Sequence, residues 1–168
     1  MNYHNITKDD MLNGDGIRVV LWVAGCLHKC KGCQNPVTWN PEGGKPFTAK
    51  EIDEIFIELS KDYVSGITFS GGDPLHPANR FMILNLSRII KQAHPDKTIW
   101  MYTGYTWEEI MNGEELFDCI QYVDVLVDGR FEIDKLDKNA HWVGSTNQRV
   151  ISVKDSLKEG AVVEFESN

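Results

Sequence analysis

Residues 17–33 read IRVVLWVAGCLHKCKGC. The first half of this stretch is rich in β-branched and aromatic side chains, a composition that favours a buried strand. Gly25 ends the apolar run, and the loop predicted to follow it carries three thiols, at Cys26, Cys30 and Cys33. The stretch therefore predicts a buried strand whose end presents a CxxxCxxC motif.

Helical patterns lie between the apolar runs of the remaining chain. Thr48 and Glu51 form a capping box, which with the helical spacing of the apolar residues predicts a helix over residues 48–61. A second helix is predicted over residues 78–93, where apolar residues fall on one face. Thr106 and Glu109 form another capping box, which predicts a third helix that Gly113 interrupts. Each of these helices follows a strand pattern, as in βαβ units.

The strand patterns complete this alternation. In chain order they cover residues 17–24, 66–70, 98–102 and 123–127, with weaker patterns near 149–153 and 161–165. Alternating strands and helices argue for right-handed crossovers and a parallel sheet. Because a full eightfold barrel typically takes about 250 residues, a chain of 168 residues predicts the α/β class with a partial, open β/α barrel.

A polar or glycine-rich segment follows each of the four stronger strand patterns. The segments are GCLHKCKGC, SGGDP, TGYT and VDGR. In parallel β/α folds the carboxyl ends of the strands lie at one edge of the sheet, where ligands bind. We therefore expect these four segments to converge on one site.

The size and charge of the chain limit its function. Its 168 residues fall in the range of a single domain, here taken as residues 1–168, which can bury a core without disulfides. With 17 Lys and Arg against 25 Asp and Glu, the formal charge of -8 argues against nucleic acid or an anionic membrane as a direct partner.

No targeting or membrane signal is visible in the sequence. Residues 1–10 contain no apolar run typical of a secretory signal, and no stretch is long and apolar enough to cross a bilayer. We therefore expect a cytoplasmic protein. In such a reducing compartment, three clustered cysteines indicate a metal site and not a set of disulfides.

Two kinds of metal site are compatible with the three thiols. Three thiolates on one short loop can hold a 4Fe-4S cluster and leave one iron open to another ligand. The alternative is a zinc site, which normally closes with a fourth ligand, and the sequence offers His28, His4 and Cys119 for that position. Cys119 stands among apolar residues and is interpreted as a small buried hydrophobe, while His28 and Lys29 are interpreted as solvated loop residues.

The motifs together resemble those of a known superfamily. A CxxxCxxC motif after one predicted strand, followed by Gly71-Gly72-Asp73 after the next, is similar to the pattern of the radical S-adenosylmethionine superfamily. Within it, the chain resembles the activators of anaerobic ribonucleotide reductase over nearly its whole length. The shared stretches are MNYH, NGDGIR, GCLHKCKGC, the pair Thr38-Trp39, SGGDPLHP, YTGY, VLVDGRF and GSTNQR.

This resemblance implies a cofactor site. Cys26, Cys30 and Cys33 would hold a 4Fe-4S cluster, whose open iron the methionine part of S-adenosyl-L-methionine would chelate. The implied cofactor contacts are Gly32, Cys33, Gln34, Gly71, Gly72, Asp73, Thr103 and Asp128. Gly32 and Asp73 depart from the wider superfamily, which more often has an aromatic residue and a glutamate there. Backbone near Gly32 is therefore the expected contact to adenine, and the carboxylate of Asp73 has a shorter reach.

Several of these polar residues also have a simple structural interpretation. Thr103 fits an ordinary turn, and Asp128 fits a residue that shapes the end of a strand. A polar turn likewise explains Ser145, Asn147 and Gln148, which otherwise would close the pocket or contact a partner. The sequence leaves both interpretations open.

The resemblance also implies a reaction. A reduced cluster passes one electron to S-adenosyl-L-methionine, which cleaves to methionine and a 5'-deoxyadenosyl radical. That radical takes a hydrogen atom from a glycine of the protein substrate, the anaerobic ribonucleoside-triphosphate reductase, and a flavodoxin-like protein is the expected electron donor. The sequence leaves open a homodimer or a complex with the reductase.

Two other functions stay open at this point. One is a radical enzyme that acts on a small molecule or on another glycyl-radical protein. The other is a zinc-stabilised interaction module without catalysis, which metal analysis after anaerobic purification would distinguish from both radical enzymes.

Overall fold

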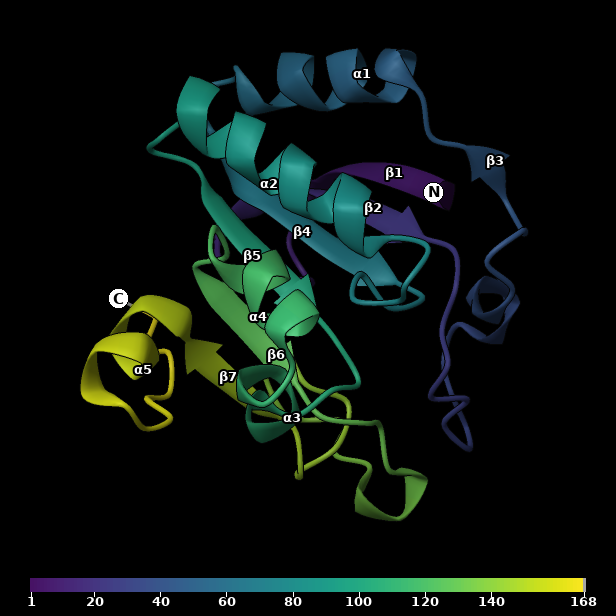
Figure 1. The fold of residues 1–168 in the computed structure, drawn as a ribbon, viewed down its shortest axis with the longest axis vertical. Coiled ribbons are helices and arrows are strands. Elements are labelled where there is room, and N and C mark those ends of the chain that lie inside the picture. The colour runs from purple at the N-terminus through teal and green to yellow at the C-terminus, as the bar shows by residue number, and fades with distance from the viewer. Residues whose placement is uncertain (168) are drawn as a thin grey trace.

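A seven-stranded mixed sheet forms the centre of the computed structural model, which describes residues 1–167 (Figure 1). The strand order is β3-β1-β2-β4-β5-β6-β7. The strands are β1 (Asn2–Asp10), β2 (Ile17–Val23), β3 (Lys45–Pro46), β4 (Val64–Gly71), β5 (Thr98–Tyr102), β6 (Val125–Asp128) and β7 (Arg149–Ser152). Since β2, β4, β5 and β6 are parallel neighbours that alternate with helices, the predicted α/β class is confirmed.

The predicted parallel sheet is confirmed in the centre of the sheet and is wrong at both of its sides. β1 pairs antiparallel with β2 and with β3, and β7 pairs antiparallel with β6. The sequence pattern does not predict β1, because Tyr3 is its one buried residue and the strand lacks an apolar alternation. A short connection over residues 11–16 suffices for an antiparallel pair, whereas a parallel pair needs a crossover of about a dozen residues or more.

Helices form part of each connection between the parallel strands. They are α1 (Ala49–Leu59), α2 (Arg80–Ala93), α3 (Trp107–Met111), α4 (Glu114–Ile120) and α5 (Val153–Glu159), with the short 3-10 helices η1 (Pro36–Trp39) and η2 (Ile133–Lys135). Both predicted capping boxes are confirmed, at Thr48 with Glu51 and at Thr106 with Glu109. Gly113 is the N-cap of α4, so the predicted interruption is also confirmed. Among residues 1–167, no helix is long and apolar enough to cross a membrane.

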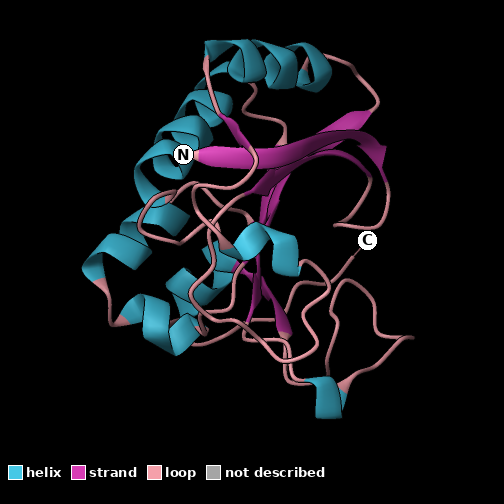
Figure 2. Cartoon of the chain, turned by 90° about the vertical axis from the view of Figure 1, so that its right-hand side faces the viewer, coloured by secondary structure: helices cyan, strands magenta, loops and turns pink. Residues whose placement is uncertain are grey.

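The main core lies between the helices and one face of the sheet. Alternate residues of β2, namely Val19, Leu21 and Val23, are fully buried on this face. They belong to one hydrophobic cluster with Ile55 of α1 and Ile83 of α2. Figure 2 shows most helices on that side of the sheet and mainly loops on the other. The period-two and helical apolar patterns therefore meet in a single layer of packing.

The opposite face of the sheet holds a smaller aromatic cluster. Trp100 of β5 packs edge-on against Trp142 and Phe165, with ring centroids 4.9 Å and 5.1 Å away. The guanidinium of Arg18, a fully buried residue near the amino end of β2, lies 5.4 Å from the Trp100 ring centre. These contacts fill this face of the sheet, and Trp142 also reaches the pocket at the carboxyl ends of the strands.

The last part of the chain differs from the weaker strand predictions. β7 covers most of the pattern near residues 149–153 and is followed directly by α5, which the sequence analysis does not predict. In the described chain, residues 161–165 contribute an isolated bridge between Ile151 and Glu164 and no strand. The run lies along the free edge of β7, where the Ser152 amide donates to the carbonyl oxygen of Val163 and the Phe165 amide to that of Val150, but these contacts are too few to form a strand.

Candidate functional site

The carboxyl ends of the parallel strands meet at a pocket of about 520 Å³. The cysteine loop after β2, the turn after β4 and the end of β5 all line it, and Gly129 after β6 adds the fourth segment. The predicted convergence of four segments is therefore confirmed. Of the predicted ligands and contacts, those that line this pocket are Cys26, Cys30, Cys33, Gln34, Gly71, Gly72, Asp73 and Thr103.

Main-chain hydrogen bonds tie the start of the cysteine loop to two other segments. The Gly25 amide donates to the carbonyl oxygen of Thr38 over 2.7 Å, and the Cys26 amide donates to that of Trp39 over 3.1 Å. The carbonyl oxygen of Gly25 accepts from the Asp73 amide over 2.7 Å. Gly25 has a φ of 103°, which glycine adopts readily, so the loop can leave β2 sharply towards these partners.

The three thiols of the loop are partly exposed and, in the described chain, not joined in disulfides. Burial raises the pKa of the Cys26 thiol, against the opposing effect of backbone amides of the loop. Burial also raises the pKa of the Cys30 thiol, against the opposing effect of the Phe131 amide. The Asn35 amide donates to Sγ of Cys33 over 3.4 Å. The Asn35 N–H group is thus directed at the Cys33 sulfur, a contact that suits a thiolate bound to an iron-sulfur cluster.

A zinc site would need a fourth ligand beside these thiols. Both ring nitrogens of His28 are engaged by other side chains, and neither His4 nor Cys119 lines the pocket. Among residues 1–167, no three His, Cys, Asp or Glu side chains are grouped to hold a single metal ion. A 4Fe-4S cluster distributes its thiolates over several irons, so the three cysteines fit the cluster better than a closed zinc site.

Cys119 lies away from the site, on the inner side of α4. Its thiol is buried and lies 3.7 Å from the carbonyl oxygen of Arg80. Burial raises the pKa of this thiol to about 11. The interpretation of Cys119 as a small buried hydrophobe is therefore confirmed.

The two glycines after β4 lie against the cysteine loop and β2. Gly71 has a φ of 98°, and a Cβ there would lie 2.8 Å from the amide nitrogen of Val23. A Cβ on Gly72 would lie 2.5 Å from the carbonyl oxygen of Gly25 and 3.0 Å from that of Thr38. Both positions therefore require glycine for close backbone approach, whether or not a ligand is bound.

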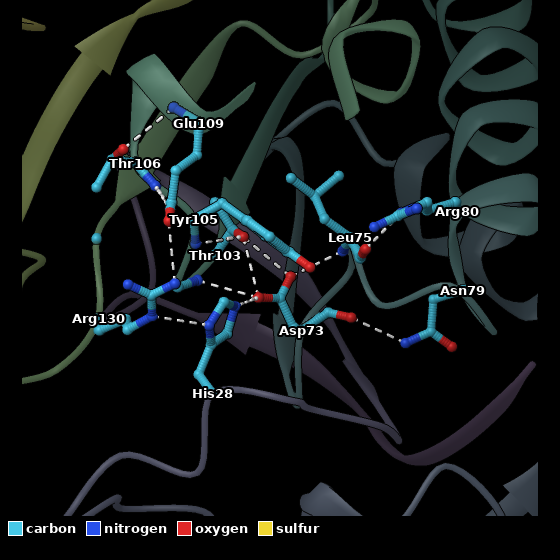
Figure 3. Close-up of polar contacts among 12 residues, drawn as sticks. His28, Asp73, Leu75, Asn79, Arg80, Thr103, Tyr105, Thr106, Glu109 and Arg130 are labelled. Atoms are coloured by element: carbon cyan, nitrogen blue, oxygen red, sulfur yellow. Dashed lines mark hydrogen bonds and ion pairs between the residues drawn. The ribbon is translucent and has the colours of Figure 1, made fainter. Parts of the chain in front are cut away.

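Asp73, the third residue of this turn, is buried, with 1% of its surface exposed. Its carboxylate accepts hydrogen bonds from His28 Nε2 over 2.7 Å and from the Leu75 amide over 2.8 Å. It also accepts from Thr103 Oγ1 over 2.9 Å and from the Gly104 amide over 3.0 Å. Figure 3 shows this carboxylate at the centre of contacts from three segments of the chain.

The prediction that His28 is a solvated loop residue is wrong. Its side chain is 6% exposed, lies between Asp73 and Arg130 (Figure 3), and packs edge-on against Tyr105 with ring centroids 4.7 Å apart. No local pattern indicates these partners, because Arg130 and Tyr105 are far from His28 along the chain. Lys29 is exposed, as predicted.

Gly32 and Asp128 do not line the pocket. A Cβ on Gly32, whose φ is 75°, would lie 3.0 Å from Cδ1 of Ile133. Asp128 is buried, accepts from the Trp107 amide over 2.7 Å at the start of α3, and forms an ion pair with Arg149. Asp128 therefore organises the end of β6 and the beginning of α3.

Polar side chains hold the segment between β6 and β7 together. Gln148 accepts from the Gly144 amide and donates to the carbonyl oxygen of Gly129, each over 3.0 Å. Asn147 donates to the carbonyl oxygen of Arg130 over 2.8 Å. The polar-turn interpretation is therefore confirmed, and Gln148 also lines the pocket.

Five aromatic residues line the pocket and are absent from the predicted cofactor contacts, namely Trp22, Trp39, Tyr102, Phe131 and Trp142. Tyr102 is the last residue of β5, so its position at a strand end is a signal that sequence analysis can use. Burial raises its pKa well above the usual value. Phe131 and Trp142 come from the irregular segment after β6, where the sequence has no periodic pattern to reveal them.

Comparisons with known proteins agree with this geometry. Residues 12–151 match the family of 4Fe-4S single cluster domains. The chain is 47% identical over 157 residues to the anaerobic ribonucleoside-triphosphate reductase-activating protein of Enterobacteria phage T4, which covers 94% of this chain and 97% of the relative. The proteins of the same name from Vibrio cholerae and Escherichia coli K12 are 42% and 43% identical, over 88% and 89% of this chain and 96% and 97% of the relatives. The chain therefore belongs to the family of anaerobic ribonucleoside-triphosphate reductase-activating proteins and contains a 4Fe-4S single cluster domain.

Proposed function

We propose that this protein activates an anaerobic ribonucleoside-triphosphate reductase by generating a glycyl radical on it. The radical arises through reductive cleavage of S-adenosyl-L-methionine at a 4Fe-4S cluster, so the protein is a radical S-adenosylmethionine enzyme. The observation that carries the proposal is the meeting of the cysteine loop and the Gly71-Gly72 turn in one pocket. The names of the relatives support the reductase as the protein substrate.

Cys26, Cys30 and Cys33 hold the cluster in this proposal. Their thiols line the same pocket, and the Asn35 amide donates to the sulfur of Cys33. Three protein ligands would leave one iron without a protein ligand, and a cofactor could coordinate there. The match to 4Fe-4S single cluster domains supports the same group.

The pocket wall beside the thiols takes S-adenosyl-L-methionine. Gly71 and Gly72 receive its methionine end, where the negative charge of Asp73 favours an ammonium group. Thr103 and the backbone at Cys33 and Gln34 line the remaining polar wall. Gly32 and Asp128 act from outside the pocket, Gly32 by packing on Ile133 and Asp128 by its contact with the start of α3.

The cofactors supply the radical chemistry, namely one electron and a carbon-sulfur bond whose cleavage yields methionine and a 5'-deoxyadenosyl radical. The chain binds and orients the reactants and keeps water away from them. Tyr102, Phe131 and Trp142 provide an apolar wall suited to that protection. No general acid or base is required of the protein for this reaction.

The fold is consistent with a protein substrate. We propose that residues 1–168 form one radical S-adenosylmethionine domain with a partial barrel, which the open sheet supports. The open side admits a flexible glycine-bearing loop of the reductase, and a flavodoxin-like protein supplies the electron. The reductase then completes the wall that a short chain does not provide by itself.

The test is anaerobic incubation of the reconstituted protein with reductant, S-adenosyl-L-methionine and the reductase. We expect a glycine-centred doublet in electron paramagnetic resonance together with 5'-deoxyadenosine. A reductase whose radical-site glycine is replaced by alanine is the control and should give no doublet. A preparation that cleaves the cofactor but never produces the doublet with its own reductase would contradict the proposal.

A further inference from the structure

The carboxylate of Asp73 is already occupied by donors of its own chain. An ionised carboxylate offers about four lone-pair sites, and four groups donate to this one: His28 Nε2, the Leu75 amide, Thr103 Oγ1 and the Gly104 amide. The residue is 1% exposed. Its oxygens therefore have little capacity for a further direct ligand, and their main effect is to join three segments around the pocket.

The hydrogen bonds of His28 define which ring nitrogen carries the proton. Nε of Arg130 lies 3.1 Å from Nδ1 of His28, and an arginine side chain can only donate. Nδ1 must therefore accept, so Nε2 carries the proton and donates to Asp73 over 2.7 Å. The same guanidinium also donates to Glu109 Oε1 over 3.1 Å, which holds it in place beside the imidazole.

The ring of His28 also fits a narrow slot. It lies edge-on to Tyr105, with ring centroids 4.7 Å apart. The imidazole also lies against Gly104. A Cβ added at Gly104 would lie 2.4 Å from Cδ2 of the imidazole, and the three atoms nearest to that Cβ would all belong to His28. The ring can therefore occupy this slot only because residue 104 is glycine.

We propose that His28 is a positioning residue, which with Asp73 anchors the cysteine loop to the ends of β4 and β5. His28 lies between Cys26 and Cys30 in the sequence, so an anchor there constrains both thiols. Asp73 then acts on the cofactor site through this anchor and through its charge. The inference rests on the proposed cluster, although the anchor itself is a property of the metal-free chain.

The anchor matters because the cluster has three protein ligands on one short loop. A loop that is already held close to its bound conformation loses less conformational entropy when the ligands bind. Hydrogen bonds and solvent access near the sulfurs also influence the reduction potential of an iron-sulfur cluster. Loss of the His28 contacts should therefore raise the flexibility of the cysteine loop and change the reduction potential of the cluster.

Two variants of His28 separate its hydrogen bonds from its volume. His28→Phe keeps a ring against Tyr105 but removes both polar contacts, whereas His28→Gln restores a donor for Asp73. The first measurement is hydrogen exchange of the peptide spanning residues 26–33 in metal-free protein. Because a hydrogen bond to a charged group is worth roughly a factor of ten or more, His28→Phe should speed exchange there about tenfold, and His28→Gln should recover most of the protection.

Gly104→Ala provides an independent test by pushing the ring out of its slot. It should speed exchange of the same peptide in wild-type protein but have no further effect in a His28→Ser background, where the ring is absent. Exchange in α2 serves as the internal control for folding. If His28→Phe also loses protection in α2, the variant is not properly folded. The comparison of Gly104→Ala in the wild-type and His28→Ser backgrounds then decides whether His28 anchors the loop.

The second measurement is the reduction potential of the reconstituted cluster, together with the rate at which a chelator removes iron. We expect the potential to shift in His28→Phe and to return in His28→Gln, with iron lost faster from the first variant. Unchanged loop exchange in folded His28→Phe, or an equal effect of Gly104→Ala in both backgrounds, would overturn the proposal. The exchange experiment uses neither metal nor cofactor, so its result is independent of whether the chain cleaves S-adenosyl-L-methionine.

Discussion

The backbone amide of Asp73 donates a 2.7 Å hydrogen bond to the carbonyl oxygen of Gly25, the residue directly before the first cysteine of the pocket. A Cβ added at Gly72 would lie 2.5 Å from that same oxygen. The turn after β4 and the start of the cysteine loop therefore share one contact surface made of main chain. A change in one of them is transmitted to the other.

Gly72→Ala should accordingly weaken both the cluster site and the cofactor site. The added methyl would push against backbone, which cannot rotate away as a side chain does. Iron content after reconstitution and equilibrium binding of S-adenosyl-L-methionine are the two measurements, and both should fall.

Gly160→Ala is the matched control for this prediction. Gly160 also lies in the left-handed region, with a φ of 68°, but a Cβ there would meet nothing within 4 Å. Gly160→Ala should lower the stability of the fold slightly and leave the iron content and the binding of S-adenosyl-L-methionine unchanged. A folded Gly72→Ala protein with normal iron content and weak cofactor binding would show that the two loops act separately.

Replacement of Cys26, Cys30 or Cys33 by Ser should strip or destabilise the cluster. Anaerobically reconstituted wild-type protein should be brown and contain about four irons and four sulfides per chain. Cys119→Ser should keep this content, because its thiol is buried on α4 and does not line the pocket. Equal loss of iron from Cys119→Ser, or a colourless protein that holds one zinc, would contradict the cluster assignment.

Arg18→Met should destabilise the fold strongly. The guanidinium is fully buried and donates to Thr68 Oγ1, to the carbonyl oxygens of Ile67 and Thr98, and to others. Burial lowers its pKa to about 10. Loss of these bonds leaves buried acceptors without a donor, at a cost of about 2–4 kcal/mol in the free energy of unfolding.

Urea unfolding of metal-free protein measures this cost. Arg88→Met, at an exposed position of α2, is the matched control and should change the free energy of unfolding by no more than about 0.5 kcal/mol. If Arg18→Met were as stable as this control, the buried guanidinium would contribute nothing net to the fold.

Glu108→Gln should reduce the dependence of stability on pH in the acid range. Hydrogen bonds from Arg149 lower the pKa of Glu108 from 4.5 to about 2. The folded state thus binds a proton more weakly than the unfolded state, so the stabilisation is complete above pH 4.5 and is lost as the pH falls towards 2. Because the Glu108 side chain is 60% exposed, solvent screening should limit the effect to about 1 kcal/mol.

The measurement is the free energy of unfolding in urea at a series of pH values across this range. The wild-type curve should fall more steeply with decreasing pH than the Glu108→Gln curve. Glu42→Gln, which removes an exposed carboxylate in a loop, is the control. Parallel wild-type and Glu108→Gln curves would indicate that the pair with Arg149 does not survive in solution.

Much of the fold follows from patterns that are local in the sequence. The capping boxes at Thr48 and Thr106, the strand at residues 98–102 and the boundary at Gly113 are all set by neighbouring residues, and all are confirmed. β1 is not predictable in the same way, because its residues are mostly half-buried or exposed and its pairing depends on β2. β1 lies between the two-residue strand β3 and β2 near the side of the sheet, and it lacks the burial on both faces that makes an apolar pattern visible.

The sequence by itself determined the chemistry of the site: three thiols on one loop, a Gly-Gly turn one βα unit later, and polar segments at successive strand ends. These features are readable because each depends on residue types at short spacing. Only the tertiary structure decided which side chains face the pocket. In the folded chain, His28 points inward and contacts Asp73 and Arg130. Asp128 instead contacts Trp107 and Arg149. The physical reason is that a buried polar group takes whichever partners folding brings within reach, and these partners come from distant parts of the chain.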